Sequence, residues 1–461
     1  MANITNTPES AGSNLMARAL REAFYAGLVA LGLFVLFVGL KTDQNILNEL
    51  VLVQRWGLLA VFVAIAAVGR FLSVAFIRPY LAERKASKAS AGVKEPGFVT
   101  RNFSMIAVAV LLVYPPIMVA IFGFQGSLKW VDNFGIQILI YVMLAWGLNI
   151  VVGLAGLLDL GYVAFYAVGA YSYALLSSYF GLSFWVLLPM AGIFAALWGM
   201  ILGFPVLRLK GDYLAIVTLA FGEIIRLVLI NWTAVTKGTF GISGIAKASV
   251  FGIWSFDVSA SNNFAKVFGL PMSSAYYKIF LFYLILALCL LTAFVTIRLR
   301  RMPIGRAWEA LREDEIACRS LGINTVTTKL TAFATGAMFG GFAGSFFAVR
   351  QGFVSPESFV FLESAIILAI VVLGGMGSLI GIAVAATLMI GGTELLREME
   401  FLKHIFGPDF TPELYRMLIF GLAMIIVMVW KPRGFVGSRE PTAFLRERKN
   451  VSGSFTKEGH G

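Results

Sequence analysis

Long apolar runs recur along nearly the whole chain, and no other feature limits its fold as strongly. A helix needs about 20 mostly apolar residues to cross a bilayer. Apolar residues make up 59% of this sequence and charged residues only 13%, and the runs lack the period-2 alternation of a membrane β-barrel. We therefore predict an all-α polytopic membrane protein with about ten to twelve transmembrane segments. The expected spans are 24–40, 51–77, 103–123, 134–152, 162–180, 184–207, 213–231, 278–297, 330–349, 363–373 with 379–390, and 414–430.

Lys and Arg are unevenly distributed among the polar segments between these runs. Most of the 37 fall on one side if the spans alternate and residues 1–20 form a flexible inside tail. Because cytoplasmic loops carry such an excess, we expect both termini in the cytoplasm. The same bias accounts for the net charge of +12 without a nucleic-acid partner. We divide the chain into 1–101, which ends in a basic linker at 78–101, a membrane core at 102–436, and a cytoplasmic tail at 437–461.

Proline and glycine interrupt several of the runs. Pro115 and Pro116 should kink or break span 103–123. The motifs GLAGLLDLGYVAFYAVGAY, beginning at Gly153, and GGMGS, at 374–378, place glycines at what we read as the cytoplasmic end of a run. Irregular backbone at membrane depth needs cover from protein or a wet cavity, and paired interruptions in two halves can mark a substrate route. The candidate pathway residues are Gly153, Gly156, Asp159, Gly161, Tyr162, Gly374, Gly375 and Gly377.

These two motifs leave alternatives open. Two glycine-rich apolar runs can match by chance, so the internal repeat is one reading of two. GGMGS can interrupt one span or separate two. Asp159 can face a cavity or cap the helix that follows, and capping is the favoured role for an aspartate at such a position.

The polar interval 298–329 has the pattern of a short amphipathic helix pair. Pro303 suits a first helical turn and Gly322 suits a C-terminal stop. Apolar and charged residues alternate at helical spacing between them, which favours an element that a soluble partner grips. The plainer interpretation is a solvated loop whose positive charges fix membrane orientation. The candidate contact residues are Arg306, Trp308, Glu309, Leu311, Glu313, Asp314, Glu315, Ile316, Arg319, Leu321 and Gly322.

Charged residues within the spans are few. Glu223 and Arg226 stand three residues apart, and each costs about 2.5–3.5 kcal/mol at the centre of a span, so we expect them to pair. The pair either lies near the pathway or a subunit contact, or, as we favour, satisfies itself and orients its span. No set of clustered carboxylates supports an ion-gradient-driven secondary transporter, which is the alternative function, and no His/Asp/Glu constellation supports a membrane enzyme.

Sites for metals and nucleotides are not expected. His404 and His460 are the two histidines, and Cys289 and Cys318 lie in different environments, so we predict neither a metal site nor a disulfide. The sequence contains no GxxxxGK[ST] phosphate-binding loop and no GxSxG nucleophile elbow. If the protein uses ATP, another subunit binds it.

Five stretches together resemble the LivM-type permease subunits of bacterial branched-chain amino-acid ABC importers. They are RMPIGRAWEALREDEIACRSLGI, GLAGLLDLGYVAFYAVGAY, GFPVLRLKGDYLAIVTLAFGEIIR, VRQGFVSPESF and LAIVVLGGMGS. The resemblance covers most of 139–432, whereas the first 100 residues and the tail match poorly. It implies a permease fold with broken, glycine-rich elements in the bacterial inner membrane, and a non-catalytic subunit that moves Leu, Ile or Val from periplasm to cytoplasm.

The resemblance also implies partners. These are a homologous second permease in a heterodimer, two cytoplasmic ATPases that bind ATP and Mg, a periplasmic substrate-binding protein and membrane lipid, with no cofactor on this chain. The interval 306–322 would then sit in an ATPase cleft, with Trp308, Leu311, Ile316 and Leu321 inserted and Glu309, Glu313 and Asp314 paired with partner cations. From their length and predicted outer position, we expect loops 232–277 and 351–361 to receive the binding protein; the alternative is that they merely cover the spans.

Overall fold

The computed structural model describes residues 8–44, 50–77, 80, 102–206, 209, 211–257, 262–398, 415–431 and 434–436. In the predicted inside segments 78–101 and 208–210, only Tyr80 and Leu209 are described. The predicted inside tail 437–461 lies wholly outside the described residues. The chain divides into two compact units, Met1–Ser104 and Met105–Gly461.

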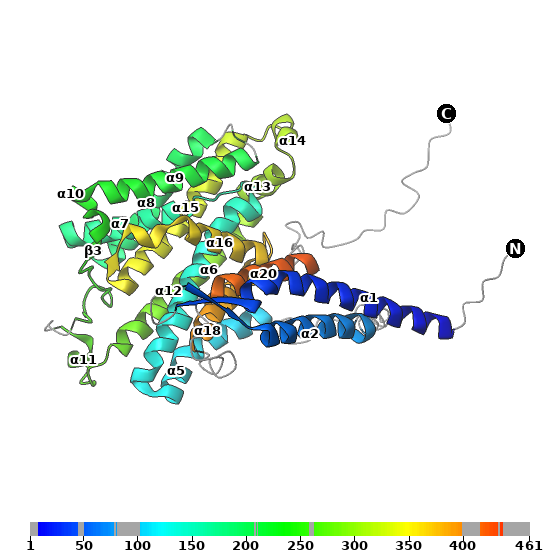
Figure 1. The fold of residues 1–461 in the computed structure, drawn as a ribbon. Helices are drawn as coiled ribbons and strands as arrows, with labels where there is room; N and C mark the ends of the chain where they lie inside the picture. The colour runs from blue at the N-terminus through cyan, green and yellow to red at the C-terminus, as the bar shows by residue number, and fades with distance from the viewer. Residues whose placement is uncertain are drawn as a thin grey trace, which may run out of the picture. The chain divides into compact units, whose positions relative to one another are not determined.

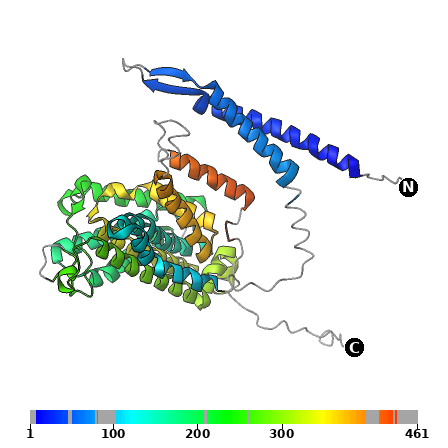
Figure 2. The same cartoon turned by 90° about the horizontal axis from the view of Figure 1, so that it is seen from below.

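The first unit is a helical hairpin closed by a two-stranded ribbon. Strands β1 and β2 are antiparallel, in a register that runs from Leu40↔Gln54 to Gln44↔Leu50. Helices α1 and α2 pack against each other along their lengths (Figure 2). The elements in chain order are α1 (Pro8–Phe34), π-helical η1 (Val35–Gly39), β1 (Leu40–Gln44), β2 (Leu50–Gln54), α2 (Trp56–Leu72) and π-helical η2 (Ser73–Ile77).

Two sequence expectations for this unit are wrong. Residues 8–20 are the first turns of α1 rather than a tail, because helix-favouring Ala, Leu, Arg and Glu continue the helix in front of the apolar run. The expected span 51–77 begins with a strand, since the alternating Leu and Val of β2 pair with β1. The α-helix of that span therefore begins only at Trp56.

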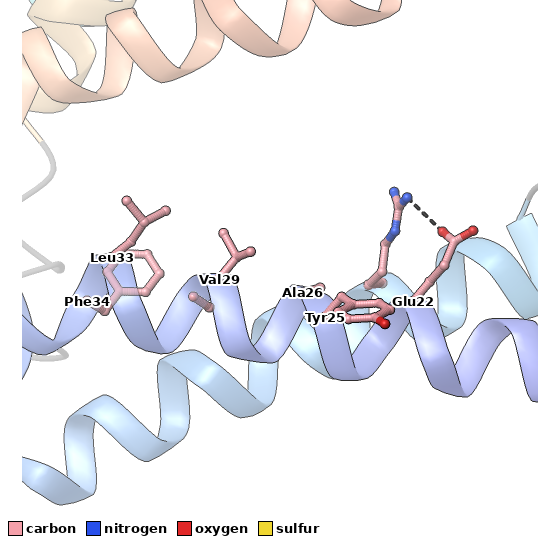
Figure 3. Close-up of a pocket in the computed structure, with 8 residues that line it drawn as sticks. Glu22, Tyr25, Ala26, Val29, Leu33 and Phe34 are labelled. Atoms are coloured by element: carbon pink, nitrogen blue, oxygen red, sulfur yellow. Dashed lines mark hydrogen bonds and ion pairs between the residues drawn. The ribbon is translucent and has the colours of Figure 1, made fainter.

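An ion pair joins the two helices of the hairpin. Arg70 Nη2 lies 2.7 Å from Glu22 Oε2, and the dashed line in Figure 3 marks this contact. The pair lies at one end of a shallow groove of about 470 Å³. The groove is lined by Glu22, Tyr25, Ala26, Val29, Ala30, Leu33, Phe34 and Arg70.

The second unit is a helical bundle built around α15, which packs against α8, α7 and α6 (Figure 1). Glycines allow this close contact: a Cβ at Gly341 would lie 2.6 Å from Ala191 O on α8. Its first elements are α5 (Phe103–Lys129, which begins two residues before the unit boundary), π-helical η3 (Trp130–Ile136), α6 (Gln137–Leu148), π-helical η4 (Asn149–Leu154), α7 (Val163–Phe180), α8 (Phe184–Val206), α9 (Asp212–Asn231), α10 (Thr233–Thr236), 3-10 helical η5 (Gly238–Phe240), β3 (Ile242–Ser243) and α11 (Phe264–Val267).

The remaining elements of the second unit include the polar interval of the sequence. They are α12 (Ala275–Arg301), α13 (Pro303–Glu313), α14 (Glu315–Ser320), α15 (Thr325–Gln351), β4 (Phe353–Val354), 3-10 helical η6 (Pro356–Phe359), α16 (Phe361–Gly374), α17 (Leu379–Ala386), π-helical η7 (Thr387–Gly391), α18 (Gly392–Glu398) and α20 (Arg416–Trp430).

The all-α membrane class is confirmed. Seven helices of the described residues are long and apolar enough to cross a membrane, and two shorter apolar helices accompany them. The expected spans 24–40 and 162–180 form α1 with η1 and α7, which are not among the seven. The seven are Trp56–Phe76, Met105–Leu154, Phe184–Pro205, Asp212–Asn231, Ala275–Arg301, Thr325–Gln351 and Leu379–Glu398.

Pro115 and Pro116 do not break α5, so the expected break is wrong, and the alternative, a kink at these prolines, stays a prediction. The helix continues through both, and its non-helical residue is Gly123, with φ of 72°. Pro116 leaves the carbonyl of Leu112 without its helical donor, but Tyr283 OH donates to that oxygen at 3.0 Å. A side chain of α12 thus replaces the missing helical bond, as neighbouring helices do in membranes.

The second unit has two chemically different ends. The loop end comprises 232–274 and 351–360, whose strands β3 and β4 pair as Ile242↔Val354 and Ser243↔Phe353. The break end comprises 149–162, 298–324 and 374–379. Helices α12 and α15 each run between the two ends, and Figure 1 shows β3 and α11 on one side with α13 and α14 on the other.

Candidate functional site

The polar interval forms the predicted helix pair at the break end. Pro303 opens α13 at its first position, where a missing N–H has no consequence. Asp314 is extended and caps α14, because its Oδ1 accepts from Ile316 N at 2.7 Å and from Ala317 N at 3.0 Å. Gly322 follows α14 with φ of 80°, a left-handed conformation suited to a helix stop.

Trp308 anchors α13 to the bundle rather than facing outward. Its side chain is fully buried, and its Nε1 donates to Thr328 O and to Thr331 Oγ1, both at 3.1 Å, on α15. Leu311 is also buried. The expectation that Trp308 and Leu311 insert into a partner is therefore wrong: the apolar stripe of α13 is already covered by its own chain.

The acidic residues of the pair also have partners within the chain. Glu309 Oε1 lies 3.2 Å from Arg300 Nε. Glu315 Oε1 lies 2.7 Å from Arg319 Nη2 and 3.0 Å from the buried Lys329 Nζ. Asp314 is the helix cap described above. Both carboxylates thus help to hold the helix pair together, and their pairing with partner cations stays a prediction.

The outward surface of the pair is centred on α14. Ile316 is 69% exposed and Leu321 is 80% exposed, which is high for large apolar side chains. Arg306 and Glu313 are exposed on α13. Cys318 is buried on the opposite face of α14, and burial, together with the carboxylates of Asp314 and Glu315, raises the pKa of its thiol. Ile316 and Leu321 are therefore the apolar contact candidates that remain.

Both glycine motifs break the bundle at this same end. The first break separates η4 from α7, and the second separates α16 from α17, where Gly375 and Gly377 have φ of 100° and 95°. Asn149 Oδ1 accepts from Gly377 N at 2.8 Å, and Trp146 Nε1 donates to Leu379 O at 2.9 Å. Two motifs more than 200 residues apart are thus in direct contact.

A short C-terminal segment, residues 434–436, forms backbone hydrogen bonds with the end of α16 at the second break. Phe435 N donates to Leu373 O at 2.8 Å, and Val436 N donates to Gly374 O at 3.4 Å. Gly374 packs so closely on α17 that a Cβ there would lie 2.6 Å from Ile382 N. The glycines of GGMGS therefore serve both a turn and a close helix contact.

Asp159 and Tyr162 are buried in the first break. Asp159 Oδ1 accepts from Gly161 N at 2.9 Å and so closes the turn before α7. The first N–H of α7, from Val163, donates instead to Ser364 Oγ at 2.9 Å, so the favoured helix-cap role of Asp159 is wrong. Among the described residues, Asp159 Oδ2 has no hydrogen-bond partner. Tyr162 OH donates to Gly336 O at 2.8 Å on α15.

Gly161 fixes the depth of this break. It packs against Thr218 O and Gly222, which lie near the middle of α9. Gly336, the partner of Tyr162, likewise lies near the middle of α15. Helix α7 therefore starts partway through the bundle rather than at its surface.

Glu223 and Arg226 form an ion pair on α9. Arg226 Nε donates to Glu223 Oε1 at 2.9 Å, and Nη2 contacts the same oxygen. Both side chains are partly exposed on the second unit. The pair therefore satisfies its own charges whatever covers this face.

Sequence reasoning missed two groups of residues. One is Arg312, whose Nη1 donates to Gly153 O in the first break. Arg312 follows Trp308 by four residues, so the two share a helix face, and that spacing was a signal that Arg312 points to the bundle. The other group lies at the loop end, where Arg350 Nε is 2.7 Å and Lys278 Nζ is 3.1 Å from Asp132 Oδ1.

The chain is similar in sequence to known membrane permeases. A family model described as the permease component of branched-chain amino acid transport systems matches residues 130–428. A second model, of a domain of unknown function, matches residues 18–114, which include the hairpin that showed little resemblance above. No solved structure matches the chain.

Three relatives illustrate the similarity. The high-affinity branched-chain amino acid transport permease LivM of Escherichia coli K12 is 49% identical over 76% of this chain and 78% of its own length. A probable LivM of Methanocaldococcus jannaschii is 24% identical over 54% of this chain and 68% of its own. The permease LivH of Escherichia coli K12 is 26% identical over 65% of this chain and 92% of its own.

Proposed function

The chain belongs to the family of permease components of branched-chain amino-acid transport systems, and we propose that it carries Leu, Ile or Val into the cytoplasm as one membrane subunit of an ABC importer. Family membership makes it a multi-pass membrane permease without a catalytic role of its own. The substrate class follows the names of the relatives. The expected direction, from periplasm to cytoplasm across a bacterial inner membrane, belongs to the same proposal.

We propose that two cytoplasmic ATPases grip the α13–α14 pair and supply ATP and Mg. The observation that carries this proposal is the pair itself: two helices anchored to the bundle by Trp308, with Ile316 and Leu321 left exposed beside the two breaks. Contiguous apolar patches on a surface mark protein contacts, and we propose that Ile316 and Leu321 belong to one such patch. Arg306, Glu313 and Arg319 surround this surface and would steer the partner more than they hold it.

The second permease would be a homologue such as the relatives named LivH, which align with 65% of this chain. We propose a heterodimer of the two, with membrane lipid around it. The exposed apolar side chains of α9 and the Glu223–Arg226 pair offer one face for that contact. A charge pair that is already satisfied can enter such a face at lower cost than a single charge.

Orientation follows from the distribution of positive charge. Arg298, Arg300 and Arg301 close α12 at the break end, so we propose that this end and both termini are cytoplasmic. The loop end would then face the periplasm and receive the binding protein. Pairing of β3 with β4 joins the two predicted docking loops, 232–277 and 351–361, into one surface, which supports a common role. Residues 258–261 of that surface lie outside the described residues.

We propose that the two breaks line the route of the substrate. The residues are Gly153, Gly156, Asp159, Gly161, Tyr162, Gly374, Gly375 and Gly377. Interrupted helices are a common setting for solute sites in transporters, and the first break reaches the middle of the bundle at Gly161 and Tyr162. Asp159 Oδ2, which lacks a partner among the described residues, is a suitable acceptor for the ammonium group of an amino acid once the breaks open.

Reconstitution tests the proposal. The chain is coexpressed with its neighbouring second permease, ATPases and binding protein, and placed in vesicles that contain ATP. We expect uptake of labelled leucine that requires ATP and the binding protein and that persists when ionophores collapse ion gradients. Uptake that depends on a gradient and not on ATP would instead establish the secondary transporter.

A further inference from the structure

Arg312 lies where α13 meets the first glycine break. Its Nη1 donates to Gly153 O, and its side chain packs on Gly156, where a Cβ would lie 2.7 Å from Arg312 Cγ. Gly156 has φ of 72°, which favours glycine for a second reason. The Arg312 side chain of α13 therefore contacts the backbone of the break directly.

The contact continues from the first break into the second. Gly153 belongs to η4, and a Cβ on it would lie 2.8 Å from Gly377 N. Asn149, one turn earlier in η4 and buried, holds Gly377 N through its Oδ1 at 2.8 Å. A shift of the Gly153 carbonyl therefore displaces the residues that hold the second break.

The residues and backbone conformations at this junction favour movement of the two breaks. A π-helical turn such as η4 often marks a functional site, and glycines at positive φ can reorient at little steric cost. A guanidinium that donates to a carbonyl forms a charge-assisted hydrogen bond, which is stronger than a neutral one. One strong contact thus joins a firmly anchored helix to two deformable segments.

We propose that Arg312 is the positioning residue that transmits movement of α13 to both glycine breaks, so that the two breaks rearrange together. The inference rests on the proposed function, in which ATPases move the α13–α14 pair. Trp308 holds one turn of α13 to α15, and Arg312 holds the next turn to Gly153. Helix α13 then acts as a lever between the ATPase surface and the substrate route.

The first experiment measures coupling in the reconstituted complex. Arg312→Gln should lower leucine uptake per ATP hydrolysed at least tenfold while copurification with the ATPases stays within twofold of the parent. Arg312→Lys, which keeps a cationic donor, should recover a third or more of the parental ratio. Arg301→Gln is the matched control, an exposed arginine at the same end, and should behave like the parent. A parental ratio in Arg312→Gln, or loss of assembly, would overturn the proposal.

The second experiment tests the junction without transport. Amide hydrogen exchange is followed in the assembled, solubilised complex, in peptides that cover 149–156 and 375–379. Arg312→Gln should accelerate exchange at least threefold in both peptides, and Arg301→Gln in neither. Acceleration in the first peptide alone would show that the contact stops at the first break and would refute joint movement. If both respond but the parent takes up no leucine, the proposed function fails while the junction stands.

Discussion

Two sites at opposite ends of the second unit differ in what holds them: an ion-pair network around Asp132 and the pair of glycine breaks. At the loop end, the side chain of Arg350 is 8% exposed, and Asp132 accepts from both Arg350 and Lys278. At the break end, glycines at positive φ are held by backbone contacts, by Asn149 and by Arg312. Partly buried charge networks lose much when one member is removed, whereas glycine turns can change conformation cheaply. Ion pairs such as Glu315–Lys329 and positive-φ glycines such as Gly241 also occur at the opposite ends, so the contrast concerns these two sites: we expect the Asp132 network to stay fixed and the glycine breaks to move.

The largest expected effect is a loss of stability at the break end, where Trp308 anchors the α13–α14 pair to α15. Trp308→Ala removes a fully buried indole and the donor to Thr328 O and Thr331 Oγ1, and such truncations cost about 3–5 kcal/mol. We expect α13 and α14 to detach from α15. Alkylation of Cys318 measures this, because its raised pKa and burial should make the parental thiol slow to react at pH 8.

The control for this anchor is Trp430→Ala, at an indole that is 81% exposed on α20. It should leave the alkylation rate of Cys318 unchanged. The thiolate fraction rises with pH, so the parental rate should still be increasing above the pH at which an ordinary thiol levels off. Slow alkylation in Trp308→Ala would show that other contacts hold the pair and that Trp308 is not its anchor.

A second prediction concerns the fixed end. Arg350→Gln leaves Asp132 with Lys278 alone and removes donors to Asn133 and Gln137, so we expect a loss of about 2–3 kcal/mol in stability. Thermal unfolding of the solubilised complex should show it, with leucine uptake per ATP within twofold of the parent. Arg397→Gln, at an exposed arginine whose contact with the partly buried Glu394 spans 3.9 Å, should cost less than about 1 kcal/mol. If Arg350→Gln uncouples transport without loss of stability, the contrast between the ends is wrong.

Much of the break end could be predicted from sequence because its signals are local. Pro303 fixes its own backbone angle, and Gly322 and the glycines of GGMGS allow the left-handed conformations of turns, so the ends and interruptions of these helices lie where the pattern predicted them. The face of α13 could not be predicted in this way. Periodicity identifies an apolar stripe, but whether α15 or a partner covers it depends on contacts distant in sequence. Trp308 was therefore assigned to the partner, and Ile316 was not distinguished from it.

The contacts at the loop end could not be predicted from local sequence patterns. Arg350 and Asp132 are 218 residues apart and have no local motif, so only the fold brings them together. The same holds for Tyr283, which donates to the carbonyl that Pro116 leaves without its helical donor. Arg312 is intermediate: its spacing from Trp308 indicated a shared face, but its acceptor, Gly153 O, depends on how the break folds.

A third prediction sharpens the account of the break end at its deepest point. Asp159→Asn keeps an Oδ1 acceptor for Gly161 N but removes the charge, so the turn before α7 should persist. If Oδ2 receives the substrate ammonium, loss of a charged hydrogen bond of about 1.5–3 kcal/mol should slow leucine uptake roughly tenfold or more. Thermal stability should not fall. Asp212→Asn, at an exposed aspartate in the first turn of α9, is the control. Parental uptake in Asp159→Asn would remove this carboxylate from the route.

The smallest expected effect is on ATPase binding by the exposed surface of α14 at the break end. Ile316→Ser and Leu321→Ser do not disturb packing within the chain, since both side chains are exposed, so each should leave thermal stability and Cys318 alkylation unchanged. If an ATPase covers them, each loses about 1–2 kcal/mol of apolar burial, or roughly five- to thirtyfold in association. Val326→Ser, at a half-exposed position on the first turn of α15, should bind like the parent. Binding of the purified ATPase to the permease in nanodiscs measures this. Parental affinity in both α14 variants would mean that the ATPase grips α13 or another surface. Movement of the ATPase would then have to reach the glycine breaks through contacts other than α14.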